Sequence, residues 1–379
     1  MSVGVDIGAN AVRVVQIDGI DDDGFAIITK VGISTLKAGS FSGGRIRNPQ
    51  NVAAALVKAL KDAGVPRYGF VIGLSAPDVA VARYALPAAV SPNERASALA
   101  TMGIQISPSL DPELSTLATS LVRIDTMADG TENAVLTVAG ALTEDVESLI
   151  TICKLAGATP KAIDLSGVAS MRSLVRTYSD ASEIATIVDI GSSKTIISTR
   201  QGAFLRSMRT ITAGGDDITR AILAITGEDH SQAERRKASL RLPGLGEDID
   251  SVVASVNINY FDEDETNLES QTSQRITNAL MRTSENLIDT IAQVLESDGA
   301  STGAFTQGIS LSGGGALLRG FKERLAQRVG VPVLVGRPWA KIQRNRKTNE
   351  MLDHDGNADP RILLALSTAI GLALWEGER

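Results

Sequence analysis

The sequence of 379 residues predicts an α/β fold built from two duplicated halves that close on a phosphate-bearing ligand. Two observations carry this prediction, a repeated turn and a repeated order of strands. Apolar strands end in the same Asp-x-Gly turn at Asp6-Ile7-Gly8 and at Asp189-Ile190-Gly191, 189 − 6 = 183 positions apart. Glycine lets phosphate oxygens approach the backbone N–H groups of such a turn, and the aspartate can hold Mg²⁺, usually through water. The paired turns therefore predict a clamp on a phosphate chain.

The strands that follow each turn repeat as well. After the first turn come Val12–Ile17 and Phe25–Ile28, and after the second come Thr195–Ser198 and Ala203–Arg206. A glycine-containing turn separates the strands in both halves, so each half predicts a β-meander. Coincidence between two buried strands is the alternative, and the matched third strand argues against it.

Composition excludes several classes of protein. The net charge of −7 argues against a nucleic-acid partner, because neutralising phosphates needs clustered Lys and Arg. Cys153 is the only cysteine, which rules out an intramolecular disulfide and fits a reducing cytoplasm. The chain starts directly with a strand and has no apolar run long enough to span a bilayer, so we expect no signal peptide and a soluble protein.

Two further glycine-rich segments predict contacts with a nucleotide. Gly313, Gly314 and Gly315 follow a predicted strand and lead into a predicted helix with apolar positions at Leu317, Leu318, Phe321, Leu325 and Val329. Glycines leave room for a ligand, and a helix N-terminus offers free N–H groups, although an ordinary strand–helix connection is the alternative. Gly214 and Gly215 open the expected helix Ile218–Ile225 and would face the phosphates if the two halves close.

A polar helix start supplies a charged pair. Glu234 and Lys237 are three residues apart on the predicted helix, so both project from one face. Such a carboxylate and ammonium could hold ribose hydroxyls and the purine edge, or could form a solvated surface ion pair. Lys194, in the second phosphate turn, would either reach the terminal phosphate or be exposed to solvent.

Taken together, these motifs resemble, over essentially the whole chain, the fold of actin, hexokinase and the Hsp chaperone ATPases. The resemblance implies an α/β actin-like ATPase fold with two duplicated RNase H-like halves, inserted subdomains, and ATP and Mg²⁺ as cofactors. It implies Mg²⁺ held indirectly by Asp6 and Asp189. It also implies nucleotide contacts from Gly8, Ala9, Asn10, Gly191, Ser192, Ser193, Glu234, Lys237, Gly313, Gly314 and Gly315.

We expect four parts in the chain. The first half (1A) would comprise residues 1–75, 164–183 and 339–379, with an inserted subdomain (1C) at 76–163. The second half (2A) would comprise 184–225 and 300–338, with an inserted helical subdomain (2B) at 226–299.

The insert at 76–163 resembles the extra subdomain of the PilM family of type IV pilus assembly proteins and of its relative FtsA. It carries an expected strand at Ala134–Gly140 and expected helices at Glu94–Gln105 and Glu144–Leu155. FtsA proteins normally end in an amphipathic membrane-binding helix, whereas this chain stops after the expected helix Arg361–Leu374, which favours a PilM-like protein.

The PilM resemblance implies a cytoplasmic scaffold, peripheral to the inner membrane through its protein partners. It implies binding to the N-terminal cytoplasmic tail of a PilN-like membrane protein and contact with other pilus assembly proteins; self-association is left open. The alternatives are a filament-forming cytoskeletal ATPase like FtsA or MreB, and a sugar kinase of the same superfamily.

The sequence departs from an efficient ATPase at the return from the insert. Related proteins often place Glu-Pro where this chain has Ser166 and Gly167, and serine cannot act as a carboxylate base. General-base assistance contributes roughly 10²–10⁴-fold to a rate. Asp164 could substitute only if the backbone stays strand-like, since alternate residues then share a face. We therefore expect nucleotide binding with, at most, slow hydrolysis, and we assign no catalytic residue.

Overall fold

Two twisted sheets form the centre of the computed structural model, which describes residues 1–37, 39–102, 110–111, 114–175, 183–202, 204–244, 263–303 and 305–375. The first sheet has six strands in the order β10-β6-β1-β2-β3-β16. The second has eight in the order β15-β14-β11-β12-β13-β7-β9-β8. Each half thus has its own sheet, and the inserted strands extend the second one.

The first sheet is the predicted meander with parallel additions at both edges. β1 (Ser2–Ile7), β2 (Ala11–Ile20) and β3 (Ala26–Thr35) pair antiparallel in sequence order. β6 (Tyr68–Leu74) pairs parallel with β1, and β16 (Ala340–Ile342) pairs parallel with β3. The strands form because branched apolar side chains such as those of β2 are buried on both faces of the sheet.

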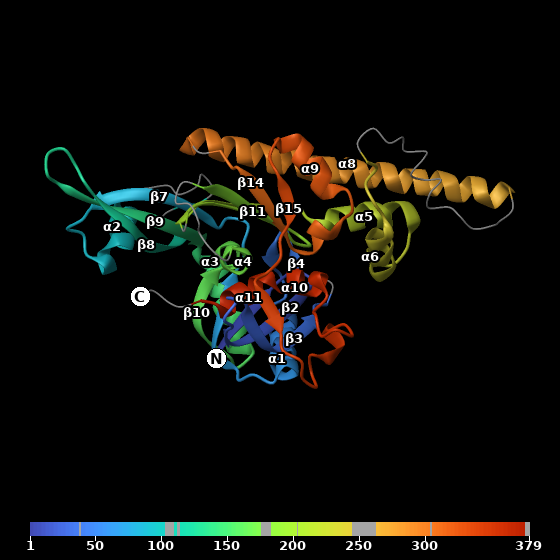
Figure 1. Cartoon of the computed structure of the whole chain (residues 1–379), viewed down its shortest axis with the longest axis horizontal. Helices are drawn as coiled ribbons and strands as arrows, with labels where there is room; N and C mark the ends of the chain where they lie inside the picture. The colour runs from blue at the N-terminus through green and yellow to red at the C-terminus, as the bar shows by residue number, and fades with distance from the viewer. Residues whose placement is uncertain are drawn as a thin grey trace.

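One helix packs on each face of this sheet, and each helix contacts the sheet closely at a glycine of a strand. A Cβ built on Gly4 would lie 2.1 Å from the carbonyl oxygen of Ala369, and one on Gly32 would lie 2.1 Å from that of Ala59. The first contact places α11 (Ser367–Ala373) against β1, and the second places α1 (Pro49–Ala63) against β3. Both helices lie in the lower body of the molecule in Figure 1. Glycine is required here because the helix backbones approach so closely.

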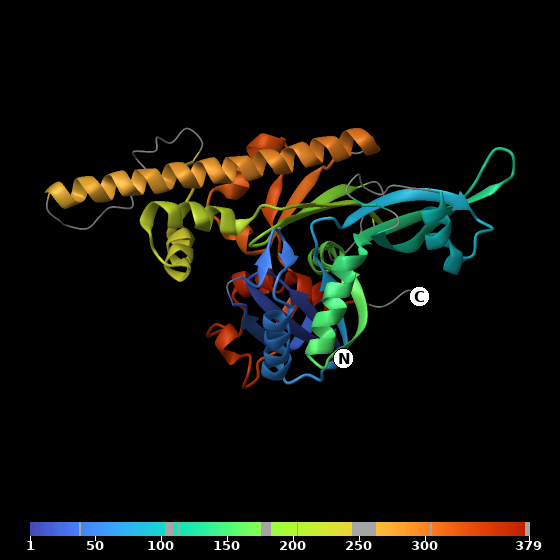
Figure 2. The ribbon, with the colours of Figure 1, turned by 180° about the vertical axis from the view of Figure 1, so that it is seen from behind.

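The second sheet repeats the meander. β11 (Ile184–Ile190), β12 (Thr195–Gln201) and β13 (Phe204–Ile211) pair antiparallel, as predicted, although Ala203 lies outside the described residues. β14 (Gly308–Ser312) and β15 (Val333–Val335) continue the sheet in parallel. The long helix α8, Glu263–Thr302, runs along the top of this half in Figures 1 and 2. It packs onto the sheet, α5 and α9 through Ile276, Leu280, Leu287, Ile288 and Ile291.

The insert forms an arm at the side of the molecule (Figure 2). Its strand β7 (Ala80–Pro87) pairs with β13 at Val81 and Met208, which joins the arm to the second sheet. β9 (Glu132–Leu142) confirms the expected strand. β8 (Ser115–Thr126) was not predicted; it pairs along β9 as the outermost strand of the sheet.

The chain returns from the arm to the first half through a helix and a strand. α3 (Thr143–Leu155) confirms the expected helix. β10 (Thr159–Leu165) then pairs parallel with β6. The chain therefore re-enters the first sheet at Thr159, before residue 164, where the first half was expected to resume. The helix expected at Glu94–Gln105 is α2, Arg95–Thr101, preceded by a 3₁₀ turn at Pro92–Glu94, and its expected last residues lie outside the described part.

Two expected helices are interrupted. A 3₁₀ turn, Gly314–Leu317, is followed by an extended Leu318, and α9 (Phe321–Val329) begins only after Gly320, whose φ of 85° is left-handed. The last helix is divided into α10 (Pro360–Ala365) and α11. At the second break Ser367 Oγ lies 2.7 Å from Ser312 Oγ, so the break joins the last helix to the end of β14.

The remaining elements are short or lie near the cleft. They are β4 (Phe41–Ser42), β5 (Arg45–Ile46), α4 (Ser166–Leu174), α5 (Gly215–Thr226), α6 (His230–Ser239) and a 3₁₀ turn at Asn349–Met351. Within the described ranges, no helix has the length and apolar character that crossing a bilayer requires.

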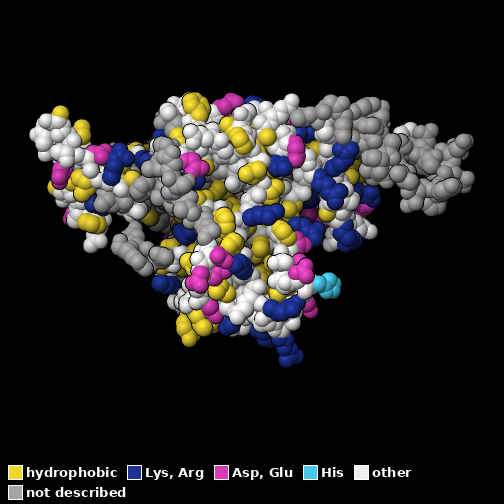
Figure 3. All heavy atoms as spheres, viewed as in Figure 1, with side chains coloured by type: hydrophobic (Ala, Val, Ile, Leu, Met, Phe, Trp, Pro, Cys, Tyr) yellow, Lys and Arg dark blue, Asp and Glu magenta, His cyan; other side chains and the backbone are white. Residues whose placement is uncertain are grey.

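In Figure 3 both signs of charge are interspersed over the face shown, with Lys and Arg most numerous over α5 and α6, where Arg220, Arg235 and Arg236 are exposed.

Candidate functional site

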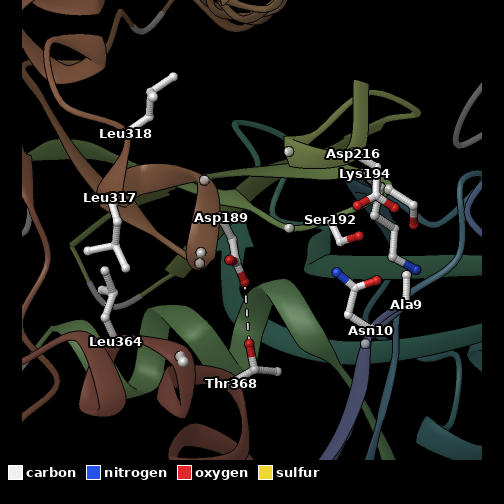
Figure 4. Close-up of a pocket in the computed structure, with 18 of the residues that line it drawn as sticks. Ala9, Asn10, Asp189, Ser192, Lys194, Asp216, Leu317, Leu318, Leu364 and Thr368 are labelled. Atoms are coloured by element: carbon white, nitrogen blue, oxygen red, sulfur yellow. Dashed lines mark hydrogen bonds between the residues drawn. The ribbon is translucent and has the colours of Figure 1, made fainter. Parts of the chain in front are cut away.

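A cavity of about 540 Å³ lies between the two halves, where the ends of β1, β11 and β14 meet (Figure 4). Both halves and the last helices contribute to its walls. The cavity is lined by nearly every residue that the sequence predicts for the site, namely Asp6, Gly8, Ala9, Asn10, Asp189, Gly191, Ser192, Ser193, Lys194, Gly215, Glu234, Lys237, Gly313, Gly314 and Gly315. The volume is within the range of roughly 300–1,000 Å³ found for small-molecule sites.

The two Asp-x-Gly turns have the same backbone geometry. The Gly8 N–H donates to the Ala11 carbonyl at 3.0 Å, and the Gly191 N–H donates to the Lys194 carbonyl at 2.9 Å. Each turn joins two antiparallel strands, and the two aspartates precede the turns at equivalent positions. The repeat seen in the sequence is therefore a repeat in structure, and it presents two matching backbone turns to one cavity.

Asp6 and Asp189 lie deep in this cavity. Burial raises the pKa of Asp6, although the nearby guanidinium of Arg13, 3.4 Å from its carboxylate, partly opposes the effect. Burial also raises the pKa of Asp189, and the charge of Asp6 adds to that increase. Asp189 accepts hydrogen bonds from the Ser170 hydroxyl at 2.9 Å and the Thr368 hydroxyl at 3.3 Å. Two incompletely compensated carboxylates in one cavity fit a divalent cation that prefers oxygen ligands.

The Gly313–Gly315 turn lies against the end of β11. A Cβ on Gly313 would lie 2.4 Å from the Ile190 carbonyl oxygen, and its φ of 78° is left-handed. A Cβ on Gly315 would lie 2.2 Å from Ile190 Cγ2. At Gly314, by contrast, no heavy atom of the described residues lies within 4 Å of such a Cβ. The outer glycines are thus required for packing, while Gly314 leaves the cavity open.

Gly214 is the exception among the predicted glycines, because it does not line the cavity. A Cβ there would lie 2.6 Å from the carbonyl oxygens of both Gly191 and Ser192, so glycine allows α5 to pack behind the second turn. The first N–H groups of α5 also point at this turn. Gly215 N–H donates to Gly191 O at 2.9 Å, and Asp216 N–H donates to Ser192 O at 2.8 Å. The start of α5 therefore supports the second Asp-x-Gly turn, and these two N–H groups are not free to bind a ligand.

Glu234 and Lys237 form the expected pair and line the cavity. Lys237 Nζ donates to Glu234 Oε1 at 2.7 Å, to Thr219 Oγ1 at 2.8 Å and to the Gly215 carbonyl at 3.1 Å. Burial alone would raise the pKa of Glu234, but the hydrogen bonds from Lys237 and Thr219 hold it below its usual value. The pair is therefore tied to α5 at the cavity wall, and is not the solvated ion pair of the alternative interpretation.

Of the two positions expected for Lys194, exposure to solvent is wrong. Its side chain is only 6% exposed, so it is not a solvent-facing residue. Its Nζ donates to the carbonyls of Ser75 and of Gly44 (3.3 Å for the latter), both in the first half. Burial lowers the pKa of Lys194 to about 8, although the carboxylates of Asp6, Asp145 and Asp189 oppose that shift.

The segment that returns from the insert offers no carboxylate to the cavity. Ser166 lines it, and the Ser166 hydroxyl is buried without a hydrogen-bond partner among the described residues. Asp164 does not line the cavity. Its carboxylate accepts from Arg172 at 3.0 Å and from the Leu165 N–H at 2.8 Å, which holds it against α4. Asp164 is thus not placed to substitute for the missing base.

Sequence reasoning missed several lining residues. Arg13 stands directly opposite Asp6 in the β1–β2 register, and a charged residue within an apolar strand was a signal that could have identified it. Thr368 gave no such signal, because its role arises from the packing of α11 beneath Asp189. An apolar wall lies farther along the cavity and consists of Ile218, Leu240, Leu317, Leu318, Leu364 and Ala365; Figure 4 shows Leu317 and Leu364 side by side.

Comparison with known protein families and structures gives consistent results. The sequence profile of the type IV pilus assembly protein PilM matches residues 4–254, and that of the cell division protein FtsA matches residues 186–370. No curated protein sequence matches the chain significantly.

Solved structures show the same fold. The structure described as "PilM-PilN type IV pilus biogenesis complex" is similar with a TM-score of 0.75 at 21% identity, over 98% of this chain and 97% of that one. The ethanolamine utilization protein EutJ from Carboxydothermus hydrogenoformans is similar with a TM-score of 0.52 at 15% identity, over 98% and 89% of the two chains. These similarities confirm the predicted actin-like α/β fold.

Proposed function

We propose that this chain, which belongs to the PilM family of type IV pilus assembly proteins, is a scaffold of the pilus machine regulated by ATP bound in its cleft. The observation that carries the nucleotide proposal is the pair of matched turns around one cavity. Each turn lines the cavity with small residues and a largely buried aspartate, and the two approach the cavity from opposite halves. A phosphate chain with its cation fits such a clamp.

The parts of the cavity suggest how ATP would lie. The turns Gly8–Asn10 and Gly191–Ser193 would hold the phosphates, and Asp6 and Asp189 would hold Mg²⁺ through water. Glu234 and Lys237 would contact the ribose, and the apolar wall around Leu317 would accept the base. Bound Mg²⁺ would supply neutralising charge for the phosphates and for the two carboxylates.

Slow hydrolysis is part of the proposal. Ser166 lines the cavity and stands in the sequence where related proteins often have a glutamate, and Asp164 is held by Arg172 away from the cavity. ATP would then act mainly through its binding free energy, favouring the closed cleft only by its differential affinity for that state. Phosphate release with excess ATP should remain well below about 1 s⁻¹, since typical enzymes reach about 10 s⁻¹. Faster turnover would contradict a regulatory role for the nucleotide.

Equilibrium titration of the full chain with a fluorescent ATP analogue tests the nucleotide proposal. We expect saturable binding to one site, weaker by about tenfold or more when EDTA replaces Mg²⁺. Absence of binding at millimolar nucleotide, by protein shown to be folded, would refute it.

For a partner, we propose the N-terminal cytoplasmic tail of a PilN-like membrane protein, which would place the chain at the cytoplasmic side of the inner membrane. Family membership and the similarity to a PilM–PilN complex support this proposal. Fluorescence anisotropy with a labelled tail peptide from the same organism provides the test, and a scrambled peptide is the control. Equal binding of the two peptides would refute the proposal of this partner.

The FtsA profile match to the second half favours filament formation as a second candidate function. Light scattering and electron microscopy with and without Mg·ATP distinguish a filament-forming protein from a pilus adaptor. A pilus adaptor should show no ATP-dependent polymer, whereas ATP-dependent filaments would support the second candidate.

A further inference from the structure

A short hairpin lies where the two halves and the insert meet. β4 and β5 are joined by Gly43 and Gly44, whose φ angles of 58° and 74° are both left-handed, as a tight two-residue hairpin turn requires. A Cβ on Gly44 would lie 3.0 Å from Pro77 Cγ, so the turn is packed against the entrance to the insert. The glycine pair thus fixes where the Gly44 carbonyl points.

Lys194 connects the second phosphate turn to this hairpin. The residue belongs to the second half, yet its Nζ donates to the carbonyls of Gly44 in the hairpin and Ser75 at the end of β6. The ring of Phe41 in β4 lies 6.0 Å from the same Nζ. A movement of the turn relative to the first half must therefore break these contacts or carry the hairpin with it.

Arg45 connects the hairpin to the insert. Its guanidinium donates to Asp78, just before β7, and to Asp145 at 3.2 Å, in the first turn of α3. Asp78 precedes the first strand of the insert, and Asp145 lies at the start of the helix by which the chain returns from it, so one side chain holds both connections. The Asp145 side chain is only 10% exposed, and a largely buried charge of this kind is sensitive to the loss of its partner.

We propose that the β4–β5 hairpin transmits the state of the nucleotide cleft to the insert, through Lys194 on one side and Arg45 on the other. The inference rests on the proposed nucleotide binding and names how that site would regulate the insert. When the second turn closes on phosphates, Lys194 moves the Gly44 and Ser75 carbonyls, and Arg45 carries the displacement to both connections of the insert. Linkage is reciprocal, so a partner bound to the insert changes nucleotide affinity by the same factor.

Hydrogen exchange of the full chain, with and without saturating Mg·AMPPNP, tests this transmission. In the wild type, nucleotide should slow amide exchange in β7 and the first turn of α3 by about fivefold or more, the lower end of typical couplings. Arg45→Gln should bind AMPPNP normally, because Arg45 does not line the cavity, but its exchange change in the insert should be lost. Arg123→Gln removes an exposed arginine paired with Asp125 in β8 and serves as the matched control, with wild-type behaviour expected.

Each outcome separates the two proposals. Failure of the wild type to bind AMPPNP would overturn both the nucleotide site and the transmission. Normal binding without any exchange change in the insert would overturn the transmission alone. If Arg45→Gln unfolds, Lys194→Met provides a second way to interrupt the transmission. Measured at saturating nucleotide, it should also lose the exchange change in the insert. Retention of the full change by a folded Arg45→Gln or Lys194→Met protein would overturn the proposal.

Discussion

The two Asp-x-Gly turns share one backbone design but differ in the side chains around their aspartates. Asp6 faces Arg13 across its hairpin, whereas the residue opposite Asp189 is Ile196. Asp189 is instead supported by the hydroxyls of Ser170 and Thr368. The fourth residue of the first turn is Ala11, buried in the core, while that of the second is Lys194.

This difference shows how a duplicated element can divide its roles. The first turn carries its own compensating charge and is packed into its half. The second keeps an aspartate without a cation in the facing position, and its lysine reaches across the cleft. We therefore expect the second turn to be the more sensitive to Mg²⁺ and to the state of the cleft.

The largest expected effect is a difference in nucleotide affinity between the variants of the two aspartates. Asp189→Asn should weaken Mg²⁺-dependent affinity by about 100-fold and Asp6→Asn by about tenfold, because only Asp6→Asn frees Arg13 from its carboxylate partner to attract the phosphates. Titrations with the fluorescent analogue in Mg²⁺ and in EDTA measure both values. Unchanged Mg²⁺ dependence in Asp189→Asn would remove Asp189 from the metal site.

The second prediction compares how substitution of each turn glycine changes the stability of the protein. A Cβ on Gly191 would lie 2.9 Å from the backbone oxygen of Lys194, whereas one on Gly8 would lie 3.0 Å from the movable end of Arg13. Gly191→Ala should therefore lower the free energy of unfolding by about 2 kcal/mol and Gly8→Ala by less than about 1 kcal/mol. Urea denaturation gives both numbers, and equal losses would mean that the turns are equally constrained.

A third, smaller effect concerns stability without nucleotide at pH 7. Burial raises the pKa of Asp189, which means that its ionised form is penalised in the folded state, and Asn can still accept from Ser170 and Thr368. Asp189→Asn should therefore stabilise the protein by about 1 kcal/mol. Asp6→Asn should stabilise it by less, since the charge of Arg13 already offsets part of the burial penalty on the Asp6 carboxylate.

The pH dependence of that gain checks its origin. Because a raised carboxyl pKa makes the folded state bind more protons, the penalty is present above the folded pKa and disappears as the pH falls through it. The advantage of Asp189→Asn should accordingly shrink on acidification toward pH 4. A gain that is independent of pH would point to packing and not to charge.

The last effect is a pH slope at Lys194. Its pKa of about 8 lies below the ordinary value of 10.5, so between these pH values the unfolded chain binds more protons than the folded one. Stability of the wild type relative to Lys194→Met should thus rise with pH in this window, by at most about 1.4 kcal/mol per pH unit. Thermal denaturation from pH 7 to 10 measures the slope, and a flat difference would show that Lys194 does not titrate there.

The sequence was sufficient to predict the parts of the site that adjacent residues encode. An apolar strand, Asp-x-Gly and a second strand specify a hairpin locally, so both meanders and both turns could be predicted. The Glu234–Lys237 pair likewise follows from helix periodicity.

The features that were missed depend on contacts between distant segments. The hydroxyls on Asp189 come from α4 and α11, and the acceptors of Lys194 come from the first half. The helix expected after Gly315 is interrupted because Gly320 takes a left-handed φ beside Leu242. Periodicity continues across such a break, so the pattern alone could not reveal it.

The most direct test of the central claim, that the cavity between the two turns is the ATP site, is to fill it. No described heavy atom lies within 4 Å of a Cβ on Gly314 in the cavity or on Gly19 in β2, which makes Gly19→Leu a matched control for Gly314→Leu. We predict that both variants melt within about 2 °C of each other. Gly314→Leu should show no binding of Mg·ATP analogue at millimolar concentration, while Gly19→Leu binds like the wild type. Wild-type affinity in a folded Gly314→Leu protein would contradict the account.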